Sequence, residues 1–240
     1  MISLAPAVKV PLQSKIVKYE FLTEDVIFLS CTRPTNFNFK AGQFISIKIF
    51  NANGIEPLFR WKSYSICSPP SQQESLDLII KLIPDGFASD AFKKMKVGDT
   101  FELRGPLGHF TFKDTEEIKD HWFLGAGTGV TPLYSMIAEH ASHQPTHHFT
   151  LVFGVRHEHN LFYTKEIEHL TKTNKNITFI PTLSRDNWPG AKGRVQLHLP
   201  KDLSNKDFYM CGLNELIQET KDLLLTAGVE KEHIHFERYD

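Results

Sequence analysis

The sequence predicts two domains: an N-terminal antiparallel β-barrel, followed by an α/β domain built on a parallel sheet. The first half of the chain consists of short runs rich in β-branched and aromatic residues, broken by Pro, Gly, Asn and Asp. After Thr115 such runs alternate with stretches of helical periodicity, which is typical of a parallel sheet covered by helices. The chain has 240 residues, enough for two domains of about 120 residues each.

The barrel is expected to contain six strands and one short helix. The strands are expected at residues 14–22, 26–32, 43–50, 60–65, 76–83 and 100–112, and the helix at 89–95. In the second half, strands are expected at 121–127, 149–156, 176–184 and 206–212, and helices at 131–141, 161–172 and 214–228. The polar segment 114–120 is predicted to link a domain of residues 1–113 to one of residues 121–240.

Composition and charge exclude several classes of function. The formal net charge is −1, so neither a nucleic-acid surface nor a polybasic membrane face is expected. The N-terminus lacks an apolar core of signal-peptide length, and no run of about 18 apolar residues could span a bilayer. We therefore expect a cytoplasmic protein with no nucleic-acid partner and no membrane span.

Neither the cysteines nor the histidines indicate a metal site. Three cysteines at 31, 67 and 211 are odd in number and too widely spaced for a disulfide framework, a zinc site or an iron-sulfur cluster. His140, His143, His147 and His148 lie close together in the sequence, but no Cys, Asp or Glu joins them at ligand spacing. We interpret them as part of a solvated loop and expect no metal.

A glycine-rich turn, "GAGTGVTP" at 125–132, lies between a predicted strand and a predicted helix. Ligands of open α/β sheets bind beyond the carboxyl ends of the strands, and small residues there let the backbone approach an anion. Val130 occupies the place of the third glycine of the strict G-x-G-x-x-G fingerprint. From this stretch alone, a pyrophosphate site and a tight turn without a ligand both remain open.

Three further motifs accompany this turn: "RWKSYSICSPP" at 60–70, "PDGFAS" at 84–89 and Cys211–Gly212. With the turn, in this order, they resemble the ferredoxin-NADP reductase superfamily. In that superfamily the barrel carries R-x-Y-S for a flavin and G-x-x-S for its phosphates. The second domain carries G-x-G-T-G-x-x-P and a C-G pair for a nicotinamide nucleotide. The resemblance runs from about residue 40 to the C-terminal "HFERYD" and assigns residues 1–113 to flavin and 121–240 to NAD(P).

The resemblance implies a flavoprotein oxidoreductase. Hydride would pass from NAD(P)H, with NADPH favoured, to bound FAD, and electrons would then pass to a separate acceptor. Ferredoxin, flavodoxin or an oxygenase component would qualify, and the enzyme is expected to be a monomer. FAD is favoured over FMN because "GFAS" offers a place for a second phosphate. Alternatives are an NAD(P)H:free-flavin reductase and a non-catalytic, redox-responsive regulatory module.

The same resemblance assigns the site residues. Ser65, Cys211 and Glu237 are the expected catalytic residues, with Cys211 positioning the nicotinamide rather than acting as a nucleophile. Lys62 stands where the superfamily has an arginine, so either Lys62 or Arg60 could hold a flavin phosphate. The expected flavin contacts are Arg60, Lys62, Tyr64, Ser65, Ile66, Gly86, Phe87, Ala88 and Ser89. The expected nucleotide contacts are Gly127, Thr128, Gly129, Pro132, Arg156, Ser184, Arg185, Cys211 and Gly212.

Nucleotide preference is expected to depend on the segment after the third strand of the second domain. Ser184 and Arg185 match a pair that binds the adenosine 2′-phosphate in NADP-dependent members, and Lys192 or Arg194 could add positive charge. Asp186 argues for NADH instead, because a free carboxylate there would accept the ribose hydroxyl and repel a phosphate. Lys93, Lys94 and Lys96 form a separate basic group that is either solvated or used to dock an acidic partner.

Overall fold

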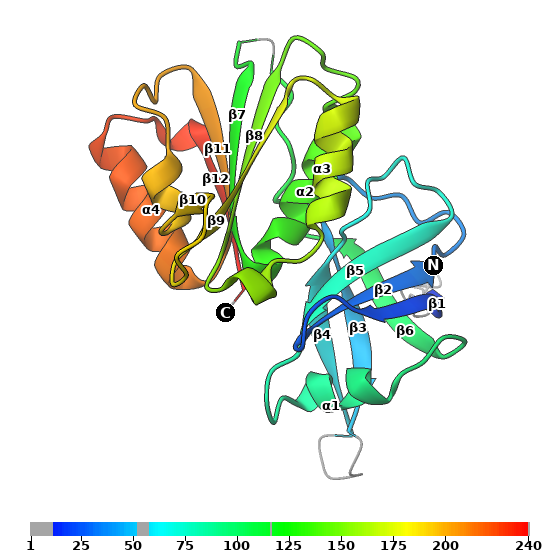
Figure 1. Ribbon diagram of the computed structural model, residues 1–240. Helices are drawn as coiled ribbons and strands as arrows, with labels where there is room; N and C mark the ends of the chain where they lie inside the picture. Colours follow the sequence, from blue (N-terminus) through cyan, green and yellow to red (C-terminus); the bar gives the residue numbers. More distant parts are fainter. Residues whose placement is uncertain (1–11, 52–57, 116, 240) are drawn as a thin grey trace, which may run out of the picture.

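The computed structural model describes residues 12–51, 58–115 and 117–239. Two six-stranded sheets follow one another along the chain, the first antiparallel and the second parallel (Figure 1). This is the two-part architecture that the sequence predicts. Residues 1–11, which belong to the N-terminal segment in which no signal peptide was found, lie outside the described residues. Glu116 of the expected linker also lies outside them.

The first sheet forms the barrel. Its strand order is β4-β3-β6-β1-β2-β5, and neighbouring strands pair antiparallel. An isolated bridge between Ile66 and Leu78 connects the end of one edge strand to the other, which closes the sheet around a core of Ile, Leu and Phe side chains. The strands are β1 (Leu12–Phe21), β2 (Val26–Thr32), β3 (Phe44–Phe50), β4 (Phe59–Ser65), β5 (Ser75–Lys81) and β6 (Thr100–Leu107).

The helix of the barrel, α1 (Phe87–Lys94), begins two residues earlier than the sequence predicts. Its N-cap is Gly86. The Ser89 hydroxyl lies inside the helix and accepts the Ile83 N–H at 2.7 Å. This contact ties the helix to the loop before it and leaves the helix N-terminus without a side-chain cap.

The second sheet is parallel throughout, with strand order β10-β9-β8-β7-β11-β12. Its strands are β7 (Asp120–Ala126), β8 (His148–Val155), β9 (Ile177–Leu183), β10 (Ala191–Lys192), β11 (Lys206–Gly212) and β12 (Ile234–Arg238). The predicted strands correspond to β7, β8, β9 and β11. The sequence analysis did not predict β10 or β12, and β12 carries Glu237.

Helices cover both faces of this sheet. Helices α2 (Val130–His140) and α3 (Thr164–Thr173) lie on one side and α4 (Asn214–Thr226) lies on the other (Figure 1). Alternate strand residues therefore enter different cores, with Phe123 packing in the core of α2 and α3 and Leu124 in the core of α4. Parallel strands covered on both faces read as continuous apolar runs, which is why these strands were recognisable.

The two domains are packed against each other along α2 and α3. The Ser135 hydroxyl of α2 donates to the carbonyl of Ser68 in the barrel domain at 2.8 Å. Tyr163, just before α3, stacks on Phe28 of β2, with ring centroids 6.0 Å apart. Because Phe28, Tyr163 and residues of both helices belong to one buried cluster, the barrel and the parallel sheet share a core at their junction.

The histidine-rich segment after α2 is not uniformly solvated as the sequence suggested. His147 is buried, and its Nδ1 lies 3.0 Å from Nε2 of His121 on β7. His143 and His148 are exposed, as expected. The described part of the chain contains no group of three or more His, Cys, Asp or Glu side chains arranged for a metal ion. Cys31, Cys67 and Cys211 are free and buried.

Within residues 12–51, 58–115 and 117–239, no helix is both long and apolar enough to cross a membrane.

The glycine-rich turn packs against β11 more closely than any side chain would permit. Residues Gly127–Gly129 form a 3₁₀ turn, and α2 begins directly afterwards at Val130. A Cβ atom on Gly129 would lie 2.1 Å from the carbonyl oxygen of Cys211. Both partners of this contact are backbone, so neither can move aside by rotating a side chain. Gly129 therefore sets the distance between the turn and the end of β11.

We expect Gly129→Ala to lower the free energy of unfolding by about 3 kcal/mol, because the new methyl group meets backbone. Gly154→Ala is the comparison, because its Cβ would lie 2.6 Å from Cγ1 of the Val195 side chain and no nearer than 3.6 Å to other atoms. A side chain shifts more readily than backbone, so we expect a smaller loss, of about 1 to 2 kcal/mol. Chemical denaturation of both variants gives the comparison, and equal losses would show that the backbone contact at Gly129 can relax.

Candidate active site

The three residues expected to be catalytic lie at the junction of the two domains. Ser65 is the last residue of β4, Cys211 lies at the end of β11, and Glu237 lies near the end of β12. In the register of β11 and β12, Cys211 pairs directly with Glu237. The fold thus brings together residues that are far apart in the sequence.

Hydrogen bonds connect this group across the domain boundary. Ser65 is buried, with 6% of the residue exposed. Its hydroxyl donates a hydrogen bond to Oε2 of Glu237 at 3.2 Å. The same hydroxyl accepts a hydrogen bond from the phenol of Tyr239 at 2.7 Å. Ser65 is therefore oriented from both sides by residues of the C-terminal segment.

Glu237 has an unusual electrostatic environment. Burial raises the pKa of its carboxyl group from an ordinary 4.5 to about 7, and the hydrogen bond from Ser65 opposes this rise only in part. Glu237 is thus a carboxyl group that exchanges its proton near neutral pH. Such groups are typical of sites where protons are transferred.

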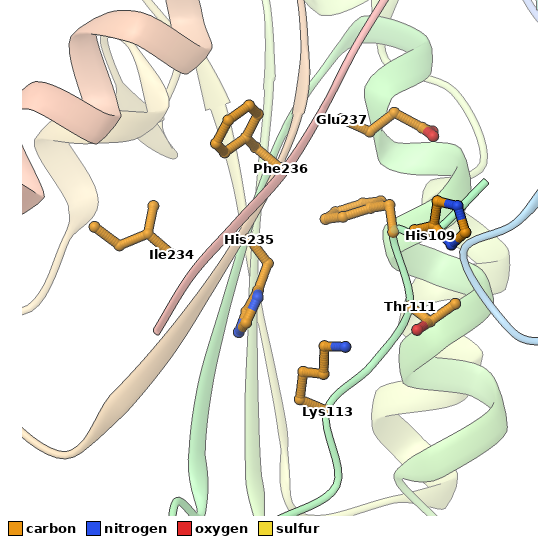
Figure 2. Close-up of a pocket in the computed structure, with 8 residues that line it drawn as sticks. His109, Thr111, Lys113, Ile234, His235, Phe236 and Glu237 are labelled. Carbon is orange, nitrogen blue, oxygen red and sulfur yellow. The ribbon is translucent and has the colours of Figure 1, made fainter. Parts of the chain in front are cut away.

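A pocket of about 400 Å³ opens beside Glu237. Figure 2 shows its walls: His235 and Glu237 come from β12, and His109, Thr111 and Lys113 come from the segment that follows β6. The pocket therefore lies between the last strand and the chain that connects the domains. Glu237 thus both lines this pocket and accepts the hydrogen bond from Ser65.

Cys211 is suited to positioning rather than to nucleophilic attack. Its residue is completely buried, and burial raises the pKa of the thiol well above its ordinary value. The thiol is therefore protonated at neutral pH. The Tyr239 hydroxyl interacts with it, and the Tyr239 N–H donates to the carbonyl of Gly212 at 3.1 Å.

Tyr239 is the site residue that the sequence analysis missed. Its hydroxyl contacts both Ser65 and Cys211, and burial raises the pKa of the phenol well above its ordinary value. A signal was present, because Glu237 and Tyr239 are two residues apart and share one face of an extended chain. It was not recognised because the strand β12 was not predicted.

On the barrel side, two of the expected flavin contacts pack against α1. The Arg60 guanidinium lies over the ring of Phe87, 4.9 Å from its centroid, and Tyr64 meets Phe92 edge-on at 5.2 Å. Lys62 is exposed. Gly86, Phe87 and Ala88 form the uncapped start of α1, next to buried Ser89, while Ile66 is buried in the barrel core.

This arrangement fits a phosphate-bearing flavin. The uncapped start of α1 presents unpaired backbone N–H groups to an anion, and the Arg60 side chain is stacked on the first residue of the same helix. The ring of Tyr64 packs against the same helix, and Tyr64 directly precedes Ser65 on β4. The strand therefore connects the helix that offers the anion site to the hydrogen-bonded group.

The glycine turn forms a second cradle at the carboxyl ends of β7 and β11. Gly127 has a φ of +54°, and nothing lies within 4 Å of the place where its Cβ would be. The buried Thr131 hydroxyl has no hydrogen-bond partner among the described residues. Open space above a glycine, beside Thr128 and a helix N-terminus, fits a ligand with phosphate groups. Gly129 and Pro132 are buried beneath the turn, and Gly212 is buried next to Cys211.

Arg156, Ser184 and Arg185 form a separate group at the ends of β8 and β9. The Ser184 N–H donates to the carbonyl of Val155 at 3.0 Å, and the Arg185 N–H donates to that of Arg156 at 2.9 Å. All three side chains are exposed. β9 lies three strands from β11, roughly 14 Å at the usual spacing, so only an extended ligand could contact both groups.

The two cations expected to reinforce Arg185 have other partners. Arg194 forms ion pairs with Glu215 at 2.9 Å and with Glu219 at 2.8 Å, both on α4. The Lys192 ammonium donates to the side-chain carbonyl of Asn187. Of the two residues that could add charge, Arg194 is thus paired with two carboxylates of α4 and Lys192 with a neutral side chain.

Comparison with known families agrees with this division of the chain. The family described as the oxidoreductase FAD-binding domain matches residues 13–112, and the family described as the oxidoreductase NAD-binding domain matches residues 123–222. The first match spans the antiparallel sheet, and the second spans the parallel sheet from β7 to β11, while β12 lies beyond it.

Individual relatives support the same assignment. The chain is 30% identical to ferredoxin–NADP reductase B of Sorangium cellulosum, over 96% of this chain and 98% of that protein. It is 28% identical to the phenol 2-monooxygenase reductase component DmpP of a Pseudomonas species, over 84% of this chain but only 58% of that protein.

A solved structure extends the comparison to three dimensions. The ferredoxin-NADP⁺ reductase of Neisseria gonorrhoeae, with bound FAD and NADP, superimposes with a TM-score of 0.82 and 26% identity, over 94% of this chain and 97% of that one. With the domain matches and the full-length relative, this leads to one assignment. The chain belongs to the ferredoxin-NADP reductase superfamily, as a flavin-dependent oxidoreductase with an FAD-binding and an NAD-binding domain.

Proposed function

We propose that the protein takes hydride from NADPH onto bound FAD and delivers the electrons to a separate acceptor protein. The observation that carries this proposal is the hydrogen-bonded group of Ser65, Glu237 and Tyr239 next to Cys211, at the meeting point of the two domains. FAD, when bound, supplies the exchange between two-electron and one-electron transfer. The protein orients the two cofactors and supplies the side chains that transfer the proton.

The barrel residues have distinct roles in this proposal. Arg60, held by Phe87, and the uncapped start of α1 bind the FAD phosphates, while Tyr64 contacts the flavin and Ser65 reaches its reactive edge. Arg60 and Lys62 are both exposed, and the contact of Arg60 with Phe87 at the start of α1 favours Arg60 as the main phosphate contact. The domain division at 114–120 follows, with residues 1–113 for flavin and 121–240 for nucleotide.

In the second domain, the nucleotide crosses the carboxyl ends of the strands. Gly127, Thr128 and Gly129 hold the pyrophosphate, Cys211 and Gly212 flank the nicotinamide, and Ser184 with Arg185 binds the 2′-phosphate. Ser65 and Glu237 provide a proton path, from the buried hydroxyl to a carboxyl group that faces the open pocket.

The acceptor is proposed to be ferredoxin, flavodoxin or an oxygenase component. This rests on the relatives, which include a ferredoxin–NADP reductase and a monooxygenase reductase component. We further propose that the protein acts as a cytoplasmic monomer. The exposed Lys93 and Lys94 of α1, with Lys96 just beyond it, supply positive charge for an acidic acceptor surface.

The purified protein is expected to be yellow, with a flavin spectrum that bleaches when NADPH is added without oxygen. Flavin binding requires the site at the start of α1, and reduction of the flavin also requires the nucleotide site at the glycine turn. Absorbance before and after anaerobic addition of NADPH or NADH tests this directly. Flavin lost during purification but reduced when added back would favour the free-flavin reductase, and bound flavin that neither nucleotide bleaches would favour the regulatory module.

Glu237→Gln should remove a pH dependence of stability. The pKa of Glu237, about 7 in the folded protein, exceeds its ordinary 4.5, so folding favours the protonated form. This contribution is fully present below 4.5 and is lost as the pH rises through 7. Between about pH 5 and about pH 8, the wild-type melting temperature should therefore fall relative to that of Glu237→Gln.

Glu168→Gln, an exposed carboxyl group on α3, is the control for this comparison and should follow the wild type. A constant difference between wild type and Glu237→Gln over the whole range would mean that Glu237 does not bind its proton near neutral pH. The proposed proton path would then lose its terminal group.

Arg185→Ala should lower kcat/KM for NADPH by about ten- to a hundredfold and leave NADH nearly unchanged. The lost charge-assisted contact to a phosphate is worth roughly 1.5 to 3 kcal/mol. Arg194→Ala is the matched control, because it also removes a guanidinium, but one that is paired with carboxylates of α4. We expect this variant to keep the nucleotide preference of the wild type. Similar losses with both nucleotides, or a wild type that already prefers NADH, would reject NADPH as the substrate.

A further inference from the structure

Both carboxylate oxygens of Asp186 have partners in a neighbouring loop. One of its carboxylate oxygens lies 2.7 Å from Nδ1 of His157, and the other accepts the backbone N–H of Glu158 at 2.8 Å. Both partners belong to the loop that follows β8, whereas Asp186 belongs to the loop that follows β9. The carboxylate therefore bridges the two loops with both of its oxygens engaged.

This bridge continues a set of backbone contacts beyond the strand ends. The N–H groups of Ser184 and Arg185 donate to carbonyls of the β8 strand end and loop, and Asp186 adds the next connection with its side chain. On the other side, the His157 ring stacks on that of His159, with centroids 5.4 Å apart and planes 5° from parallel. His157 is thus held between a carboxylate and a second imidazole.

The hydrogen bonds of Asp186 determine how near its negative charge lies to the Ser184 and Arg185 side chains. The hydrogen bond from His157, and after it the one from the Glu158 N–H, lower the pKa of Asp186, so its carboxylate is ionised. An ionised carboxylate released toward the Ser184–Arg185 pair would pair with Arg185, accept a ribose hydroxyl and repel a 2′-phosphate. Bound to His157, it forms no ion pair with Arg185 among the described residues.

We propose that His157 is a positioning residue that sets the nucleotide preference by binding Asp186 and withdrawing it from the 2′ position of the adenosine ribose. This inference rests on the proposed function, because it assigns the source of the NADPH preference within the same site. The residues that would touch the nucleotide are Ser184 and Arg185, and His157 acts on them through Asp186. The chemical class selected is a nucleotide with a 2′-phosphate.

Three variants test the role of His157. His157→Ala removes the donor, His157→Asn keeps an N–H near the position of Nδ1, and the double variant His157→Ala/Asp186→Asn also removes the released charge. We expect His157→Ala to lower kcat/KM for NADPH about three- to tenfold, through KM rather than kcat, with NADH unchanged or improved. His157→Asn and the double variant should both recover most of the NADPH value.

A binding measurement separates this inference from catalysis. Calorimetric titration with 2′,5′-ADP and with 5′-AMP reports the 2′-phosphate contact without any redox step, and His157→Ala should weaken only the former. His169→Ala, an exposed histidine on α3, is the matched control and should bind both as the wild type does. Equal losses for both probes in His157→Ala, or no recovery in the double variant, would overturn the inference.

The failure of the proposed function would look different. If neither NADPH nor NADH reduced the flavin of the wild type, the proposed reaction would be wrong whatever the binding data showed. If both reduced it and the wild type bound 2′,5′-ADP no tighter than 5′-AMP, hydride transfer would stand and the role of His157 would be rejected.

Discussion

The hydrogen bonds of one buried hydroxyl hold the two halves of the active site together. Ser65 has a single proton, which it donates to Glu237, and it accepts the proton of Tyr239. The barrel supplies the hydroxyl and the parallel sheet supplies both partners, so the site geometry depends on how the two domains pack. The shared core at the junction, with Phe28 stacked on Tyr163, fixes that packing. Rigid cores thus place short side chains whose own reach is small.

Most of the fold could be predicted because most of its strands and helices have a recognisable local sequence pattern. Strands such as β8 and β11 are buried on both faces and appear as unbroken apolar runs between glycines and polar loops. β12 has no such run: its sequence Ile-His-Phe-Glu-Arg becomes a strand because β11 offers it an open edge. β10 is two residues long and depends on β9 in the same way. Strand formation that depends on a partner leaves little trace in the sequence.

The candidate site could likewise be predicted where it depends on local sequence, but not where it depends on contacts between distant segments. Ordered motifs located the glycine turn, the Ser65 strand end and Cys211, because each is a contiguous segment with its own backbone requirement. Contacts between distant loops were out of reach, as two cases show. The sequence left Asp186 open as a ribose contact, but its carboxylate binds His157. His147 was expected in solvent but is buried beside His121. Only the folded arrangement of neighbouring strands brings these pairs within hydrogen-bond distance.

The place of β12 in the chain has a consequence for the order of assembly during synthesis. The barrel precedes the parallel sheet along the chain and is therefore synthesised before it. Its nascent form already contains Arg60, Tyr64 and the start of α1, whereas the partners of Ser65 arrive only with residues 237 and 239. The hydrogen bonds across the domain boundary can therefore form only after β12 has been made. A chain that ended before residue 237 would keep the barrel motifs but lack both side chains that orient the Ser65 hydroxyl.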